Sequence, residues 1–393
     1  MYFSEDEYAG RLSQVRASMS ALDLDALLVT GPENITYLTG YTTPGYHIFQ
    51  CVIVPIDGPL TFVVRNTERT NIPDLPWIGE SVPIGVANLS DPAPILLSTI
   101  RITLGGARRI GFDSAALFLP PKVYLALATE LADRLVEAPG VVERARRLKS
   151  PQEIELIERA TRLAEAGIVA GLGAFGHTTT DSEVASAALA RVAELGGEYT
   201  GSPAYIVPGV SSLVSHTTHA RRTVRDDEPL RLEVCASIGR YHGVLTRTVT
   251  RREPTEELQR YFELSAAAGE AMRLAARPGT TIGEVDRAGR SLVEAEVPPE
   301  YWPNRGGYSM GIAYPPGLGE GDVLDIRAGD ERPIEVGMVF HILPTLRVPG
   351  LAAVGCTDTF AVEADETRFL STLPRRVLTS ADAPALDTTV PSV

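Results

Sequence analysis

The chain has 393 residues, of which 44% are hydrophobic and 22% are charged, and its formal net charge is −14. This length suits two domains of ordinary size, each with its own core. The negative charge argues against nucleic acid or an anionic membrane as a partner, and no apolar run is long enough to span a bilayer. The acidic residues 1–7 lack the basic and apolar regions of a signal peptide, so we expect a cytoplasmic protein.

The first part of the chain alternates helical and strand-like patterns. Residues 5–22 carry apolar side chains at helical spacing, and residues 25–30 form an apolar run that Gly-Pro ends. Further strand-like runs occupy residues 50–54, 60–64 and 109–112, with helical stretches between several of them. This alternation predicts an α/β unit, which we assign to residues 1–145.

A second unit is expected over residues 146–380. A basic stretch precedes it, and then Ser150, Pro151 and Glu153 have the spacing of an N-cap, a first helical residue and a capping-box glutamate. A long amphipathic helix is therefore predicted from Pro151 onward.

The second unit carries a weak internal repeat. Residues 178–184 resemble residues 280–285, and each segment follows an Ala-rich helix and opens another. The last residues, 381–393, are rich in Ala, Asp, Pro and Thr, and we expect them to form a flexible tail.

Three cysteines are widely separated and do not form a disulfide framework: Cys51, Cys235 and Cys356. Each lies in an apolar, strand-like context, so we expect small buried side chains. Nucleophilic catalysis by Cys235 is the alternative.

Residues 232–248 are the most informative segment, because they read as two apolar strands joined by a tight turn at Gly239. Both strands nevertheless carry ionisable side chains: Glu233, Arg240, His242 and Arg247. Burying such groups costs several kcal/mol unless they are paired or used. The hairpin therefore contains either an ion pair of Glu233 with one of the two arginines or an active site.

This hairpin resembles the pita-bread family, which includes aminopeptidase P, prolidase, creatinase and ectoine hydrolase. The resemblance covers nearly the whole chain and depends on three segments: Glu233 with residues 240–242 and 247–248, residues 307–316 with Gly319 and Glu320, and residues 34–41. It implies an α/β (α+β) fold with an N-terminal creatinase-like domain and a C-terminal pita-bread domain with a pseudo-twofold repeat. It also implies a homodimer in which the N-terminal domain contributes to the neighbouring active site.

The metallopeptidases of that family use five metal ligands. The resemblance places those positions on Glu233, Val244, Tyr308, Leu343 and near Thr357. A dinuclear site needs several carboxylates, which Val, Leu and Tyr cannot replace. The resemblance is therefore closest to the metal-free branch of ectoine hydrolase and creatinase, and we expect no metal and no other cofactor.

We predict a hydrolase of a non-peptide C–N bond in a small cyclic or amidine-like amino-acid derivative, with a zwitterionic or cationic substrate. A ring-forming or dehydrating biosynthetic enzyme on the same scaffold is one alternative. An Xaa-Pro dipeptidase with an atypical metal site and an inactive binding module are two others.

Metal-free hydrolysis needs a proton shuttle, a group that attacks or activates water, and donors for developing charge. His216 takes the position of creatinase's catalytic histidine and is the expected acid/base, with His219 as second choice. Glu233 is the candidate nucleophile, base or cation binder. His242 either takes part in the chemistry or orients Glu233, and the hydroxyl of Tyr308 is a candidate donor.

Six further residues are candidates for binding the substrate: Arg240, Arg247, His341, Tyr46, Arg65 and Arg69. Arginine is favoured because its planar fork grips a carboxylate with two hydrogen bonds. For His341 a core position is the alternative, while Glu320 and Asp358 are expected at the solvated surface.

Overall fold

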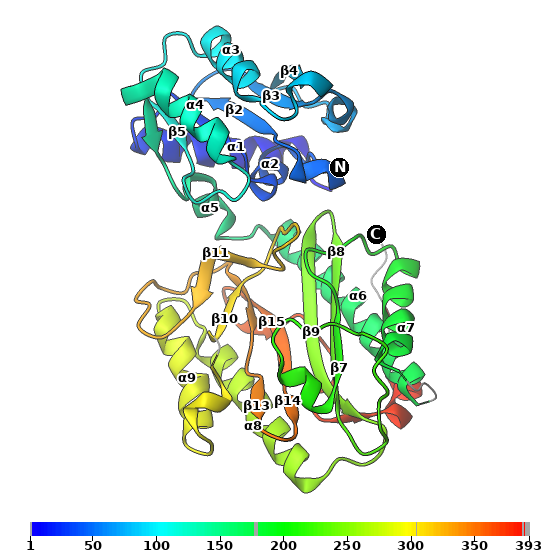
Figure 1. Ribbon diagram of the computed structural model, residues 1–393. Coiled ribbons are helices and arrows are strands. Elements are labelled where there is room, and N and C mark those ends of the chain that lie inside the picture. The colour runs from blue at the N-terminus through cyan, green and yellow to red at the C-terminus, as the bar shows by residue number, and fades with distance from the viewer. Residues whose placement is uncertain (1, 177–179, 304, 387–388, 390–393) are drawn as a thin grey trace. The chain divides into compact units, whose positions relative to one another are not determined.

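The chain folds into two compact units, Met1–Arg146 and Arg147–Val393, each of which mixes helices and strands (Figure 1). The computed structural model describes residues 2–176, 180–303, 305–386 and 389. Within these ranges no helix combines the length and the apolar character that crossing a bilayer requires.

The first unit is built on a six-stranded mixed sheet in the order β4-β3-β2-β1-β5-β6. Its strands are β1 (Ala26–Val29), β2 (Cys51–Pro55), β3 (Leu60–Arg65), β4 (Ile78–Ile84), β5 (Ile110–Phe112) and β6 (Leu135–Glu137). Its helices are α1 (Glu5–Ala21), α2 (Pro32–Thr39), α3 (Ala93–Thr103), α4 (Pro121–Leu131) and α5 (Val141–Arg146). The predicted first helix and the four predicted strands are confirmed, because their apolar residues form the core of this unit.

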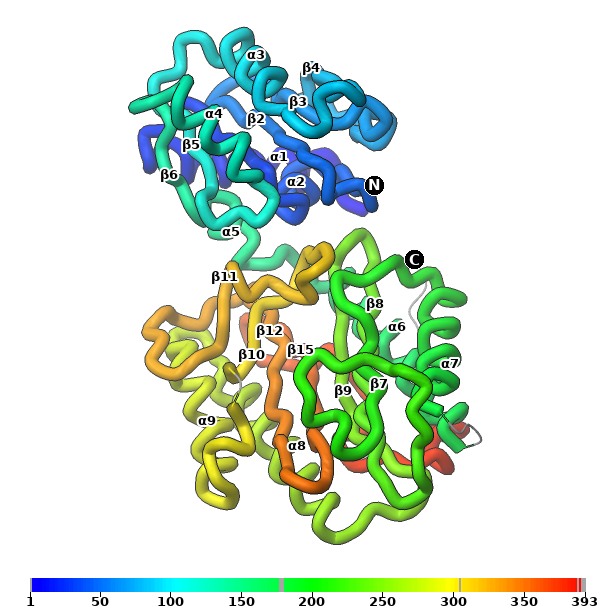
Figure 2. Tube along the Cα trace, in the orientation of Figure 1, coloured from blue at the N-terminus to red at the C-terminus, as the bar shows by residue number. Residues whose placement is uncertain are grey.

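The second unit contains a nine-stranded sheet. Its main path runs β11-β10-β12-β15-β9-β8-β7, and β16 and β17 pair with β15 and β9. The strands are β7 (Tyr205–Pro208), β8 (Leu230–Ile238), β9 (Tyr241–Thr250), β10 (Gly307–Ser309), β11 (Glu320–Ile326), β12 (Val339–Ile342), β15 (Cys356–Val362), β16 (Thr367–Phe369) and β17 (Leu378–Thr379). A separate hairpin joins β13 (Leu346–Val348) to β14 (Ala352–Val354). Figure 2 traces β15 beside β9 although the two strands lie far apart in the sequence.

The long helix predicted from Pro151 is α6 (Pro151–Phe175), and its capping box is confirmed. Ser150 Oγ accepts a hydrogen bond from the Glu153 amide, and the Glu153 carboxylate accepts one from the Ser150 amide. The other helices of this unit are α7 (Asp181–Glu194), α8 (Glu256–Ala275) and α9 (Ile282–Glu294).

The internal repeat appears as two helix pairs on one sheet. Helices α6 and α7 pack against β8 and β9, whereas α8 and α9 pack against β15 and β11. Helices α7 and α9 each begin at a threonine capping box, Thr180 with Glu183 and Thr281 with Glu284. Residues 177–179 of the first copy lie outside the described residues.

The C-terminal segment contains a 3-10 helix, Ser380–Ala385. In the expected tail, residues 387–388 and 390–393 lie outside the described residues. All three cysteines are buried and free, which confirms them as small core side chains. Burial raises the pKa of the Cys235 thiol well above its ordinary value of 9.0, so this thiol is a poor nucleophile.

Glycine at position 243 lets helix α6 approach strand β9 closely. A Cβ atom built on Gly243 would lie 2.1 Å from the backbone nitrogen of Thr161 and 2.5 Å from the carbonyl carbon of Ala160. Such distances are below any van der Waals contact, and helix backbone cannot move aside as a flexible side chain would. The helix that covers the central hairpin therefore depends on this glycine.

We expect Gly243→Ala to destabilise the second unit by about 3 kcal/mol or more, because overpacking at a backbone contact forces the layers apart. Gly173→Ala, in the helix α6 that Gly243 contacts, is the control, since its Cβ would meet only Ala383 Cβ at 3.7 Å. Urea unfolding followed by Trp302 fluorescence in a Trp77→Phe background reports on the second unit. Equal midpoints for the two variants would contradict this account of the contact.

Candidate active site

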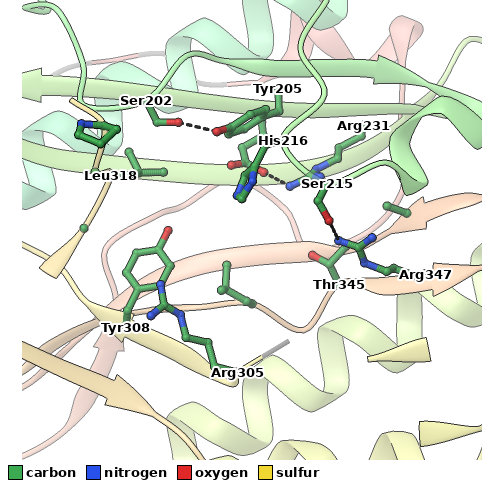
Figure 3. Close-up of a pocket in the computed structure, with 16 residues that line it drawn as sticks. Ser202, Tyr205, Ser215, His216, Arg231, Arg305, Tyr308, Leu318, Thr345 and Arg347 are labelled. Atoms are coloured by element: carbon green, nitrogen blue, oxygen red, sulfur yellow. Dashed lines mark hydrogen bonds and ion pairs between the residues drawn. The ribbon is translucent and has the colours of Figure 1, made fainter. Parts of the chain in front are cut away.

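A pocket of about 420 Å³ opens in the second unit (Figure 3). It is lined by residues from β7, β8, β10, the β13–β14 hairpin and the loops around them: Ser202, Tyr205, Ser215, His216, Arg231, Glu233, Arg305, Tyr308, Pro316, Gly317, Leu318, Gly319, Leu343, Thr345, Arg347 and Ala353. Three of the four residues predicted to be catalytic, His216, Glu233 and Tyr308, thus line one cavity.

Glu233 is held in the wall of the pocket by two neighbours. It lies on β8 opposite Thr246 of β9 and is only 7% exposed to solvent. Thr246 Oγ1 donates a hydrogen bond to Glu233 Oε2 at 2.9 Å, and Arg231 forms an ion pair with the same oxygen. The prediction that Glu233 pairs with Arg240 or Arg247 is therefore wrong, because its partner is Arg231. Because Arg231 stands two residues before Glu233, both side chains lie on the same face of β8.

His216 lies in an exposed loop at the pocket and has a left-handed backbone with φ of 56°. Such a conformation is costly for a residue other than glycine, so the surrounding structure must hold it. Arg347 does so by donating hydrogen bonds to Leu213 O at 2.7 Å and to Ser215 Oγ at 2.8 Å. Farther along, the carboxylate of Asp181 accepts the amides of Ala220 and Arg222.

Tyr308 enters the pocket from the opposite side. Figure 3 shows its phenol and the imidazole of His216 directed into the same space. Burial, followed by the negative charge of Glu233, raises the pKa of Tyr308 far above its ordinary value of 10.0. The hydroxyl therefore stays protonated and can donate a hydrogen bond at any working pH.

His341 supports Tyr308 from behind. It pairs with Tyr308 across β10 and β12, their ring centroids are 5.6 Å apart, and its Nδ1 lies 3.2 Å from Thr359 Oγ1. Burial lowers the pKa of His341 to about 4. The residue is 1% exposed and does not line the pocket, which matches the core position that the sequence left open.

His242 lies away from the pocket. It faces Ser237 across the hairpin, whereas Glu233 faces Thr246, four residue pairs further along. The imidazole is fully buried, with Nε2 accepting the Gly201 amide at 2.9 Å and Nδ1 lying 2.8 Å from Arg240 O. The histidine thus ties the hairpin turn to a loop and does not touch the cavity.

The two hairpin arginines expected to bind substrate also point elsewhere. Arg240 donates to the carbonyls of Tyr199 and Ala313 and lies between the rings of Tyr199 and Tyr314. Arg247 is fully buried and forms an ion pair with Asp358 at 3.2 Å. Neither lines the pocket.

Two acids that the sequence places at the surface are in the core. Glu320 is 2% exposed and Asp358 is 1% exposed, so the prediction of solvated positions is wrong. Each is stabilised by a cation distant in the sequence: Lys149 Nζ lies 2.7 Å from Glu320 Oε2, and Arg375 joins Arg247 at Asp358. Paired charges of this kind can be buried where single ones cannot.

Tyr46, Arg65 and Arg69 belong to the first unit. The ring of Tyr46 packs against Phe118 at 5.7 Å, and Arg69 is exposed and donates to Ser81 Oγ. A role for these residues in the site of a neighbouring subunit stays a prediction.

Sequence reasoning missed three arginines that line the pocket: Arg231, Arg305 and Arg347. Arg231 could have been found from the two-residue period of its strand, which places it beside Glu233. Arg305 donates to Asp325, and its guanidinium lies 4.6 Å above the Tyr308 ring. Arg347 lies in a short hairpin whose place in the fold no local pattern indicates.

The five positions that the family resemblance assigns to metal ligands do not form a metal site here. Val244 faces Cys235 across the hairpin, Leu343 lines the pocket, and Thr357 pairs with Thr246. Glu233 is the only carboxylate in this set, and it already pairs with Arg231. Among the described residues, no three His, Cys, Asp or Glu side chains are grouped to hold a metal ion. The residues therefore do not fit a dinuclear cation site.

Two family descriptions match the chain. The model of metallopeptidase family M24 matches residues 155–364, and that of the creatinase/prolidase N-terminal domain matches residues 11–148. The protein therefore belongs to metallopeptidase family M24, with an N-terminal creatinase-like domain and a C-terminal pita-bread domain.

Relatives match over almost the full length. An ectoine hydrolase from Halomonas elongata is 26% identical over 409 residues, which covers 95% of this chain and 98% of the relative. A prolidase from Thermococcus sibiricus has a TM-score of 0.84 at 21% identity and covers 95% of this chain and 99% of its own. The dipeptidase PepE from Mycobacterium ulcerans has a TM-score of 0.80 at 21% identity, covering 96% and 99%. These solved structures share the fold.

The burial of His242 predicts a specific dependence of stability on pH. Burial, followed by the positive charge of Arg240, lowers the pKa of His242 from 6.5 to about 3. Between these values the unfolded chain binds a proton that the native state refuses, so this residue's contribution to stability falls as the pH falls. We expect the cost of His242→Gln to be on the order of 2 kcal/mol smaller at pH 5 than at pH 8.

Urea unfolding at both pH values measures this difference. Ser237→Ala changes the residue opposite His242 without removing a titratable group, so its cost should be equal at pH 5 and pH 8. A cost of His242→Gln that does not change with pH would show that the imidazole protonates in the folded protein.

Proposed function

We propose that the protein hydrolyses a non-peptide C–N bond in a small cyclic or amidine-like amino-acid derivative without a metal ion. The observation that carries this proposal is the composition of the pocket. Glu233, His216 and Tyr308 line one cavity, while valine, leucine and threonine occupy positions where the resemblance places metal ligands. The likeness to the Halomonas elongata ectoine hydrolase over nearly the whole chain supports the same class of substrate.

The proposed roles follow from the hydrogen bonds around each group. Both neighbours of Glu233 bind Oε2, so the other oxygen, Oε1, takes none of these hydrogen bonds and serves as the base for a water molecule. The water oxygen adds to the amidine carbon while its proton passes to Glu233. Tyr308 donates a hydrogen bond to the polar group that develops at this carbon.

His216 then transfers a proton to the departing nitrogen as the C–N bond breaks. The hydroxyl of the intermediate loses its proton to solvent as the carbonyl forms, and Glu233 releases the proton that it took from water. Its place on an exposed loop at the pocket lets the imidazole exchange protons with solvent between turnovers. One water is consumed, and the products are an amine and an amide. The reaction uses no oxidant and no further reactant.

We expect Glu233→Gln to lower kcat with ectoine or a related cyclic amidine carboxylate by at least 1,000-fold, because an amide cannot accept the proton from water. Product formation followed by mass spectrometry measures this loss. Glu253→Gln, at an exposed glutamate outside the pocket, should retain wild-type activity. Unchanged turnover in Glu233→Gln would exclude Glu233 as the base, and no turnover in either protein would point to a pocket that binds without catalysing.

Metal analysis of the same purified protein separates the proposal from a dipeptidase. We expect activity to survive exhaustive treatment with a chelator and not to rise with added Mn²⁺, Co²⁺ or Zn²⁺. Stoichiometric metal together with metal-dependent cleavage of Xaa-Pro dipeptides would overturn the proposed reaction.

Tyr308→Phe should lower kcat by about 10- to 1,000-fold and leave the fold intact, since only a buried donor is lost. Because burial keeps the pKa of Tyr308 far above 10, the rate should show no alkaline limb from this residue below pH 10. A pH–rate profile of both proteins measures this. Loss of an alkaline limb in the variant would assign Tyr308 a role in proton transfer instead.

A further inference from the structure

The charges that line the pocket do not balance. Arg231 is paired with Glu233, and Arg305 shares Asp325 with Arg327. Arg347 has no acidic partner among the described residues of the chain. The cavity therefore carries one guanidinium charge that no carboxylate of the described protein offsets.

Arg347 is fixed by two hydrogen bonds that leave part of its guanidinium group without these partners. It lies on β13 opposite Ala353 of β14, and its two hydrogen bonds reach Leu213 O and Ser215 Oγ. A guanidinium group has five N–H donors, so three are not engaged by these bonds. Figure 3 shows the group beside Thr345 and Ser215, two residues that also line the pocket.

We propose that Arg347 anchors a carboxylate group of the substrate at the β13–β14 end of the pocket. This rests on the proposed function, because it names which end of the amino-acid derivative lies away from Glu233. The planar fork of arginine matches the two oxygens of a carboxylate.

A carboxylate suits this site better than a phosphate. A carboxylate has one negative charge and the site has one unpaired guanidinium, so their charges cancel. A phosphate with close to two negative charges would exceed the charge of this one guanidinium, since Arg231 and Arg305 each already contact an acid, Asp325 being shared with Arg327.

The same arginine connects substrate binding to His216. Its Nη2 donates to Ser215, the residue that precedes His216 in the loop. A carboxylate bound by Arg347 therefore lies next to the segment that holds the strained His216 backbone. The proposed carboxylate anchor therefore adjoins the loop that carries His216.

The test uses ligand-observed NMR titrations of the full chain with acetate at constant ionic strength. We expect wild type to bind acetate and Arg347→Met to bind it at least 10-fold more weakly. Arg347→Lys, which keeps the charge and loses the fork, should lie between the two. Arg260→Met removes an exposed arginine far from the pocket lining and should match wild type.

Three outcomes would overturn the proposal. Acetate could fail to bind wild type, it could bind Arg347→Met as tightly, or inorganic phosphate could bind the same arginine more tightly than acetate. If Arg347→Met does not fold, the comparison of wild type with Arg347→Lys decides. Acetate binding that depends on Arg347, in an enzyme that cleaves no cyclic amidine, would keep the carboxylate anchor and reject the proposed reaction.

Discussion

The pairing of Glu233 with Arg231 on one face of β8 determines the character of the pocket. A single carboxylate in this wall would be too costly to bury, and a single arginine would be too. Arg231 and Glu233, two residues apart on one face of β8, neutralise each other, and Thr246 on the neighbouring strand donates a further hydrogen bond to the carboxylate. Glu233 therefore stands on a paired hairpin and not on a loop.

The pocket has the opposite electrostatic character from the cation site that the family resemblance implies. A dinuclear metal centre gathers carboxylates, whereas this cavity gathers three arginines and one glutamate. This character suits the proposed organic substrate with a negative group, although the chain belongs to a family of metallopeptidases. Fold and chemistry are set by different residues, because the packing of α6 on β9 does not involve the side chains that line the cavity.

Several polar residues that resemble parts of an active site are structural. His242 joins the turn at Arg240 to Gly201, and the turn itself needs positive φ at both Gly239 and Arg240. Arg247 and Lys149 each stabilise a buried acid. These groups give the core its fixed register. Because these side chains are ionisable, the sequence alone suggests functional roles for them, and only their partners in the structure show that they stabilise the core.

The sequence alone determined the local structure and the family. The capping box at Ser150, the alternation of β8 and β9 and the choice of Glu233, His216 and Tyr308 all depend on near neighbours or short motifs. Only the tertiary structure decided which charges pair. Lys149 meets an acid 171 residues away, and the partners of Arg347 lie more than 130 residues before it. A sequence pattern records spacing along the chain, whereas ion pairs and cavities depend on distance in space, and only the packed sheet brings such residues together.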